Sequence, residues 1–88
     1  MTIRLTGVAI KRDDQIHLSN YQYHDHLRKE LGDEDCYHEP PGDESGFCTS
    51  EGNFLTRHEA IPIGLASGQL SPHWNEAGRD LLSSDIIW

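Results

Sequence analysis

The feature that most constrains the fold is the segment from Gly46 to Glu59. Its two short apolar runs flank a polar tetrapeptide that contains Gly52 and Asn53. These two residue types tolerate positive φ angles, so the pattern predicts a β-hairpin with a four-residue loop. Thr56 and Glu59 then have the spacing of a capping box, which predicts that a helix begins where the second strand ends. Strands and a helix this close together favour an α+β fold with short antiparallel hairpins.

Two helices are expected, and a glycine follows each of them. The first is predicted from Tyr21 to Leu31, before Gly32, and the second from Arg57 to Ser67, before Gly68. Glycine is the residue that most often adopts the left-handed conformation just past a helix end. Pro62 lies about one and a half turns into the second helix, where its ring and missing N–H predict a bend or a delayed start.

The N-terminal part of the chain predicts a second hairpin. The stretch Ile3–Ile10 has several β-branched residues, and Gln15–Leu18 places its apolar side chains on one face. A polar turn separates the two stretches, so both are expected to be strands. Ser19 or Asn20 is then positioned to cap the first helix.

We expect a single small domain over residues 1–88, with two segments outside these elements. The sequence from Glu30 to Glu44 holds seven acidic residues and no Lys or Arg. Residues 33–44 are therefore predicted to form a solvated, mobile acidic loop. Residues 69–88 form a C-terminal tail that ends in Leu-Leu-Ser-Ser-Asp-Ile-Ile-Trp. Its large apolar side chains predict that the tail docks, either on the domain or on another copy of the chain.

The small apolar content predicts self-association. Leu, Ile, Val and Phe make up 19 of the 88 residues, close to the limit below which chains do not bury enough apolar surface to fold. Domains of this size are commonly stabilised by disulfides, metals or self-association. No apolar leader or membrane span is present, so a cytoplasmic protein with free Cys36 and Cys48 thiols is expected. We therefore favour a homo-oligomer.

The charge balance restricts the partners. Fifteen acidic residues against seven basic ones give a net charge of −8. This charge repels phosphate backbones and anionic lipids, so neither direct nucleic-acid binding nor membrane binding is expected. The charge serves either solubility or mimicry of nucleic acid. In the second case the acids between Glu30 and Glu44 would cover a basic partner surface, in the manner of an anti-CRISPR-like inhibitor.

The sequence contains no strong catalytic or metal-binding motif. It has no Gly-x-Ser-x-Gly elbow, phosphate-binding loop or His-Glu-x-x-His pattern, so an enzyme is not expected. His24 and His26 point to different faces of a helix, and the pair Cys36 and His38 lies in the acidic segment. Zinc sites use four ligands in closely spaced pairs, a pattern to which these residues are a poor match. We expect neither a metal nor another cofactor.

A ligand site is predicted around the start of the second helix. Arg57 is expected at its first position, where free N–H groups and the helix dipole favour an anion. The preceding hairpin offers Phe47 and Phe54 as stacking surfaces, and Thr49 and Asn53 as hydrogen-bonding groups. These groups suit the recognition of a nucleotide base and phosphate. The alternative is that both phenylalanines belong to the core and that Arg57 is solvated.

The same segment resembles a group of small proteins often met in phage genomes. Their pattern is roughly Gly-Phe-x-Thr-x-x-Gly-x-Phe-x-x-Arg-x-Glu-Ala, then Ala-x-Gly-Gln, closing with Leu-x-Ser-x-Asp-Leu-Trp. This chain is similar over Gly46–Ala60, Ala66–Gln69 and Leu82–Trp88, with one extra residue before the final Trp. The match covers about half of the chain. Pro62 and the acidic insert at 33–44 depart from the pattern.

The resemblance extends to phage proteins of the anti-Thoeris and anti-CBASS sponge kind, which sequester cyclic nucleotide signals of bacterial immunity. It implies a non-enzymatic anti-defence protein that binds the signal uncut, in pockets between the subunits of an oligomer. Arg57 would pair with a phosphate, and Phe47 or Phe54 would stack on a base. His24 and Arg28 would complete the pocket from the first helix.

Overall fold

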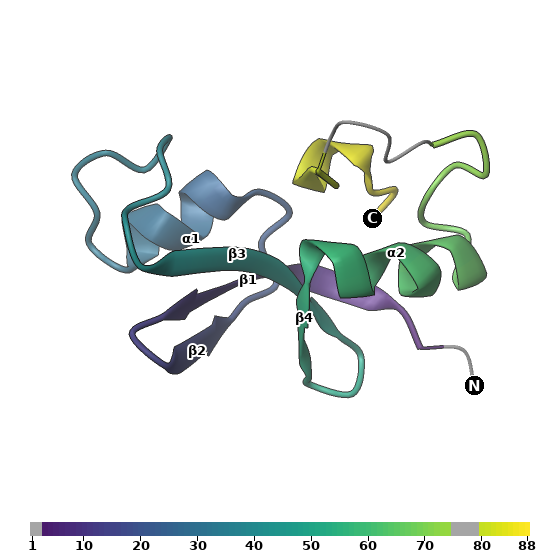
Figure 1. Cartoon of the computed structure of the whole chain (residues 1–88), viewed down its shortest axis with the longest axis horizontal. Coiled ribbons are helices and arrows are strands. Elements are labelled where there is room, and N and C mark those ends of the chain that lie inside the picture. The colour runs from purple at the N-terminus through teal and green to yellow at the C-terminus, as the bar shows by residue number, and fades with distance from the viewer. Residues whose placement is uncertain (1–2, 75–79) are drawn as a thin grey trace.

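The computed structural model describes residues 3–74 and 80–88. In this part of the chain a four-stranded antiparallel sheet carries two α-helices and the C-terminal segment on one side (Figure 1). The predicted α+β class is therefore confirmed. The strands are β1 (Leu5–Arg12), β2 (Gln15–Leu18), β3 (Asp43–Thr49) and β4 (Phe54–Thr56), the helices are α1 (His24–Glu30) and α2 (Arg57–Ala66), and a short 3₁₀ helix, η1, spans Ser83–Asp85.

Both predicted hairpins are confirmed, and they join through a central pairing of β1 with β3. The strand order is β2-β1-β3-β4, with every neighbouring pair antiparallel. The first hairpin turns at Asp13 and Asp14, which have φ angles of 49° and 66°. Positive φ at both turn residues matches the twist of the flanking strands, so β1 extends further than expected, to Arg12.

The core lies between the sheet and the layer of helices. Val8 and Ile10 of β1 and Phe47 of β3 are fully buried on the covered face of the sheet. The C-terminal segment joins this core, and the N–H of Ile87 donates to the carbonyl of Gln69 at 2.7 Å. The tail therefore docks on its own domain, the first of the two predicted alternatives. The helices and the tail contribute Leu27, Ala60, Leu70, Leu81 and Ile86.

Helix α2 begins where the capping box predicts. The N–H of Glu59 donates to Thr56 Oγ1 at 3.1 Å, and the N–H of Thr56 donates to Glu59 Oε1 at 2.9 Å. The bond from the Thr56 N–H holds the pKa of the Glu59 carboxyl below its usual range. Pro62 does not delay the helix, whose first residue is Arg57. Gly68 follows its end with a φ of 77°.

Helix α1 begins later than predicted. Its N-cap residue is Tyr23, which makes no side-chain capping bond, and the helix starts at His24 instead of Tyr21. The predicted cap at Ser19 or Asn20 is wrong because the chain still runs beside β1 at these residues: the N–H of Val8 donates to the carbonyl of Tyr21 at 2.9 Å. Ser19 Oγ donates to the carbonyl of Val8 at 2.7 Å and accepts from the N–H of Tyr21 at 3.3 Å, so it binds the segment after β2 to the central strand.

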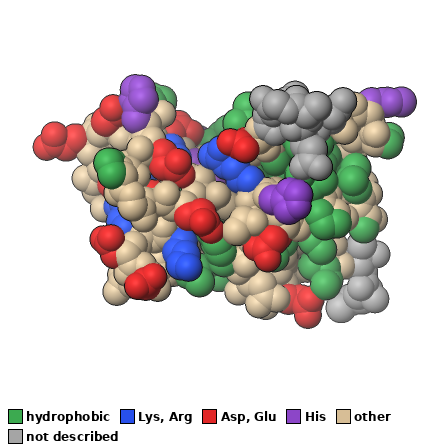
Figure 2. Space-filling model, viewed as in Figure 1, with side chains coloured by type: hydrophobic (Ala, Val, Ile, Leu, Met, Phe, Trp, Pro, Cys, Tyr) green, Lys and Arg blue, Asp and Glu red, His purple; other side chains and the backbone are tan. Residues whose placement is uncertain are grey.

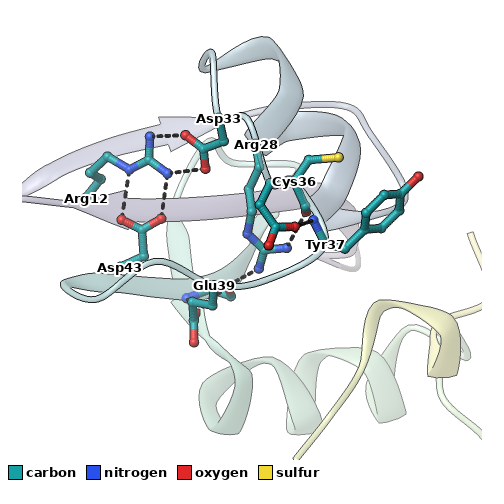
Figure 3. Close-up of polar contacts among 9 residues, drawn as sticks. Arg12, Arg28, Asp33, Cys36, Tyr37, Glu39 and Asp43 are labelled. Carbon is teal, nitrogen blue, oxygen red and sulfur yellow. Dashed lines mark hydrogen bonds and ion pairs between the residues drawn. The ribbon is translucent and has the colours of Figure 1, made fainter.

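The acidic segment is more structured than a solvated loop. Arg12 forms two bidentate ion pairs (Figure 3). Its Nη1 and Nη2 lie 2.9 and 2.8 Å from the carboxylate oxygens of Asp33. Its Nε and Nη2 lie 2.8 and 2.7 Å from those of Asp43. The Asp43 side chain is only 2% exposed and belongs to β3. Hydrogen bonds from Arg12 lower the pKa of Asp33. The prediction of a solvated segment is wrong for these two acids, because β1 supplies a cation between them.

Replacing Arg12 with Gln should destabilise the domain. The buried Asp43 carboxylate would lose its charged partner, which costs about 2 kcal/mol or more of the free energy of unfolding. Lys11→Gln removes the same charge from an exposed neighbouring position and is the matched control. Urea titrations of the three proteins measure the difference. Equal midpoints for Arg12→Gln and Lys11→Gln would contradict the importance of the paired aspartates.

Candidate functional site

A hollow of about 400 Å³ opens between α1, the acidic segment and the start of α2. Basic and acidic side chains lie next to each other across the middle of this face of the molecule (Figure 2). Three of the seven predicted ligand residues meet in the hollow, although α1 and α2 are far apart in the sequence. The lining consists of His24, Asp25, Arg28, Tyr37, Glu39, Arg57 and Ser83.

Arg28 reaches the hollow from the buried side of α1. It follows His24 by four residues, so both side chains lie on the helix face that packs against the sheet. Arg28 Nη1 donates to the carbonyl of Cys36 at 3.1 Å, and Nη2 donates to Ser45 Oγ at 3.1 Å (Figure 3). The residue is 6% exposed, and its Nε has no hydrogen-bond partner among the described residues. A buried N–H without a partner is costly, and an anionic ligand would relieve that cost.

Arg57 approaches the hollow from the first position of α2. Its Nη1 lies 3.8 Å from Asp80 Oδ2, and the Asp80 side chain is 80% exposed. Like that of Arg28, its Nε is buried and makes no hydrogen bond within residues 3–74 and 80–88. The positive end of the α2 dipole adds to the attraction for an anion at this position. The ion pair with Asp80 is long and exposed, so it binds Arg57 only weakly.

His24 contributes a neutral side chain to the site. Its Nε2 lies 2.7 Å from the carbonyl oxygen of Gly46, so Nε2 carries the proton and Nδ1 is left as an acceptor. Burial lowers the pKa of His24 to about 4, with smaller contributions from Arg57 and Arg28. The ring is therefore uncharged near pH 7 and does not add a third cation.

Two of the remaining predicted residues are enclosed by the domain. Phe47 is fully buried, and its ring centre lies 5.5 Å from that of His24 and 6.3 Å from that of Trp88. It has no exposed face on which a base could stack, so the alternative that placed it in the core describes it correctly. Thr49 is also buried, and its Oγ1 accepts hydrogen bonds from the N–H groups of Glu51 and Asn53 within the hairpin loop.

Phe54 and Asn53 do not line the hollow either. Side chains alternate between the two faces of a strand, so Gly46 and Phe47 face opposite ways. A Cβ on Gly46 would lie 2.9 Å from the Phe54 ring, which places this ring on the face opposite to the helices. Asn53 is exposed in the hairpin loop. None of the four hairpin residues that the sequence predicted as ligand contacts therefore lines this hollow.

The hollow also contains residues that the sequence analysis did not single out. Tyr37 and Glu39 come from the acidic segment, and Ser83 comes from η1. No periodic pattern marks these residues, because long-range packing brings them together. Asp25 is the exception, because it lies next to the predicted site residue His24 in the sequence and could have been singled out for that reason.

Two kinds of functional feature are absent from residues 3–74 and 80–88. No group of three or more His, Cys, Asp or Glu side chains there is arranged to hold a metal ion. Cys36 and Cys48 are free thiols, and His38 Nδ1 lies 2.7 Å from Asp35 Oδ2. No helix in these ranges has the length and apolar character needed to cross a membrane.

The fold and the hollow define a small α+β domain with two arginines at one pocket. The chain belongs to the Phage T4 y16D protein family, whose model matches residues 6–88. The phage grouping indicated by the sequence pattern is thus confirmed. Comparisons with curated proteins and with solved structures returned no match.

The low pKa of His24 predicts a loss of stability in mild acid. Unfolded His24 binds a proton near its ordinary pKa of about 6.5, whereas the folded residue does so only near 4. The unfolded state is therefore favoured as the pH falls from about 6.5 towards 4, by about 2 kcal/mol at pH 5. Urea titrations at pH 7 and pH 5 measure this difference.

His24→Gln should remove much of that pH dependence. His26→Gln alters an exposed histidine on the same helix and should retain the dependence. An equal loss of stability between pH 7 and pH 5 in the wild type and His24→Gln would show that other groups cause it.

Proposed function

We propose that this protein binds a small nucleotide through its phosphate, leaves it chemically unchanged, and so sequesters a cyclic nucleotide signal of bacterial immunity. The observation that carries the proposal is the pair of buried, unpartnered Nε–H groups of Arg28 and Arg57, whose side chains line the same hollow. Guanidinium groups bind phosphate oxygens through charge-assisted hydrogen bonds.

The surroundings of the two arginines support an exchangeable anion. Cys36 and Ser45 hold Arg28 through its Nη1 and Nη2 atoms, and its buried Nε–H makes no hydrogen bond within the described residues. Arg57 has only the distant, exposed carboxylate of Asp80 as an ion-pair partner among the described residues. A phosphate could replace that carboxylate without breaking a close hydrogen bond. The volume of about 400 Å³ is typical of small-molecule pockets.

Binding without catalysis is favoured by the state of His24. Its proton-bearing Nε2 is hydrogen-bonded to the Gly46 carbonyl, and a pKa of about 4 makes Nδ1 a weak base near pH 7. The histidine in this pocket is therefore poorly suited to remove a proton from a nucleophile. We include in the proposal that the protein is not an enzyme.

A homo-oligomer is part of the same proposal. The outermost strand β2 exposes Ile16 and Leu18 to 52% and 43%. An exposed apolar edge strand is a surface on which a second copy could pair. Such pairing would supplement the small core of the single domain.

The alternative of an acidic protein-interaction inhibitor stays a prediction, and the structure favours it less. Asp33 and Asp43 are paired with Arg12, and Glu39 Oε1 accepts hydrogen bonds from the N–H and the hydroxyl of Ser45. These three acids are therefore less available to a basic partner than a solvated segment would make them.

Arg57→Ala should abolish nucleotide binding and leave the fold intact. Loss of a charge-assisted contact to phosphate should weaken binding at least about tenfold. Native mass spectrometry with cyclic di- and trinucleotides and ADP-ribose-type nucleotides would show complexes of intact ligand mass with the wild type. Lys29→Ala, an exposed cation on α1, is the matched control. If Arg57→Ala binds every nucleotide as the wild type does, the site assignment is wrong.

Asp80→Asn should have the opposite effect on affinity. The substitution removes the carboxylate that lies 3.8 Å from Arg57 and competes with a phosphate for it. We expect affinity to rise a few-fold, as the loss of an exposed ion pair allows. Isothermal titration of the nucleotide bound most tightly by the wild type measures the change. Weaker binding by Asp80→Asn would indicate that Asp80 contacts the ligand.

A further inference from the structure

The proposed phosphate pocket also presents carboxylates, which a site for a bare anion would not need. Asp25 is half-buried in the lining and makes no hydrogen bond or ion pair with another residue of the described ranges. Glu39 also lines the hollow, and its contacts with Ser45 use Oε1. A carboxylate close to a bound phosphate repels it unless another part of the ligand compensates.

A ligand can offset this repulsion by offering the carboxylate a hydrogen-bond donor. Ionised Asp and Glu are acceptors only, so Asp25 would be satisfied by an O–H or N–H group of the ligand. A ribose places hydroxyl donors close to a phosphate on the same small molecule. Carboxylates bind ribose hydroxyls in this way in dinucleotide-binding proteins of other folds.

An aromatic surface is available at the rim of the same hollow. Tyr37 is 78% exposed, lines the hollow, and extends outward from the acidic segment (Figure 3). The N–H of Tyr37 donates to Asp35 Oδ1 at 3.2 Å, which helps to position this part of the backbone. An exposed ring beside a phosphate site can stack on a nucleotide base. Tyr37 thus offers the contact that buried Phe47 cannot make.

We infer that the ligand is a ribonucleotide, with a ribose hydroxyl bound by Asp25 and its base stacked on Tyr37. This inference rests on the proposed function, because it requires the phosphate to lie at Arg28 and Arg57. It adds a selectivity that the arginines cannot provide. A pocket that hydrogen-bonds a hydroxyl discriminates against the analogue that lacks it, because the carboxylate is then left without a donor.

The test compares ribonucleotides with their 2′-deoxy analogues. The probes are cyclic di-AMP and AMP, each with its 2′-deoxy form, and inorganic pyrophosphate, all titrated calorimetrically into the full chain. We expect the wild type to bind the ribose form of at least one pair about tenfold more tightly than the deoxy form. Pyrophosphate should bind more weakly than that ribonucleotide.

Three variants separate the contacts. Asp25→Ala should lose the preference for ribose without weakening pyrophosphate binding. Glu30→Ala removes the same charge from an exposed position on α1 and should retain the preference for ribose. Tyr37→Ala should weaken the ribose and deoxy forms alike and leave pyrophosphate unaffected. Thermal melts verify that each variant is folded.

The outcomes distinguish this inference from the function on which it rests. Equal affinity of the wild type for ribose and deoxy forms, or for pyrophosphate and nucleotides, would overturn the inference and leave a phosphate-binding site. Retention of the ribose preference by Asp25→Ala would overturn the assignment of Asp25, and unchanged nucleotide binding by Tyr37→Ala would overturn that of Tyr37. Failure of the wild type to bind any of these probes would overturn the inference, and failure to bind any cyclic dinucleotide, cyclic trinucleotide or ADP-ribose-type nucleotide would contradict the proposed function as well.

Discussion

The paired contacts of Arg12 with Asp33 and Asp43 hold together the parts of the molecule that form the pocket. Arg12 ends β1, Asp33 lies just beyond α1, and Asp43 begins β3. Helix α1 has only seven residues and no side-chain cap, so its own backbone hydrogen bonds do not make it stable. Its position depends on packing of Leu27 in the core and on the anchor at Asp33. The pocket residues of α1 therefore depend on an ion cluster outside the pocket.

The same cluster helps to explain how two arginines line one hollow of an acidic chain without a close carboxylate partner in the part of the chain that the structure describes. Asp33 and Asp43 are occupied by Arg12, and the hydroxyl of Ser45 lies between Arg28 and Glu39 as the hydrogen-bond partner of both. Arg28 is thereby held without direct neutralisation by a close carboxylate. Within residues 3–74 and 80–88, the ion pair of Arg57 is the long contact with Asp80. Local pairing, and not the net charge of −8, decides what the hollow attracts.

Local sequence signals predicted most of the fold. The capping box of Thr56 and Glu59 and the hairpin before it are formed by residues close in the chain, so their chemistry was readable. Ser19 was misassigned as a cap because its segment stays beside β1, where the Tyr21 carbonyl accepts from the Val8 N–H, and this contact exists only once the first hairpin has formed. The two acids that bind Arg12 were misassigned for a similar reason: their partner comes from a strand distant in the sequence.

The candidate site was less predictable than the fold. The predicted helix start placed Arg57 correctly, whereas strand alternation directs Phe47, ten residues earlier, into the buried core. Tyr37 carried no local signal, because its approach to Arg57 depends on how the acidic segment returns across the sheet. Long-range packing thus decided which of the residues with suitable chemistry share a pocket.

The most direct test of the account is NMR of the arginine side chains. In a ¹H–¹⁵N spectrum of the Nε–H groups, titration with a bound nucleotide should shift the signals of Arg28 and Arg57, whose Nε–H groups lack partners. The Arg12 signal should remain in place, because its Nε–H donates to Asp43 at 2.8 Å. Unchanged Arg28 and Arg57 signals at saturating nucleotide would contradict the central claim that this pocket binds the phosphate.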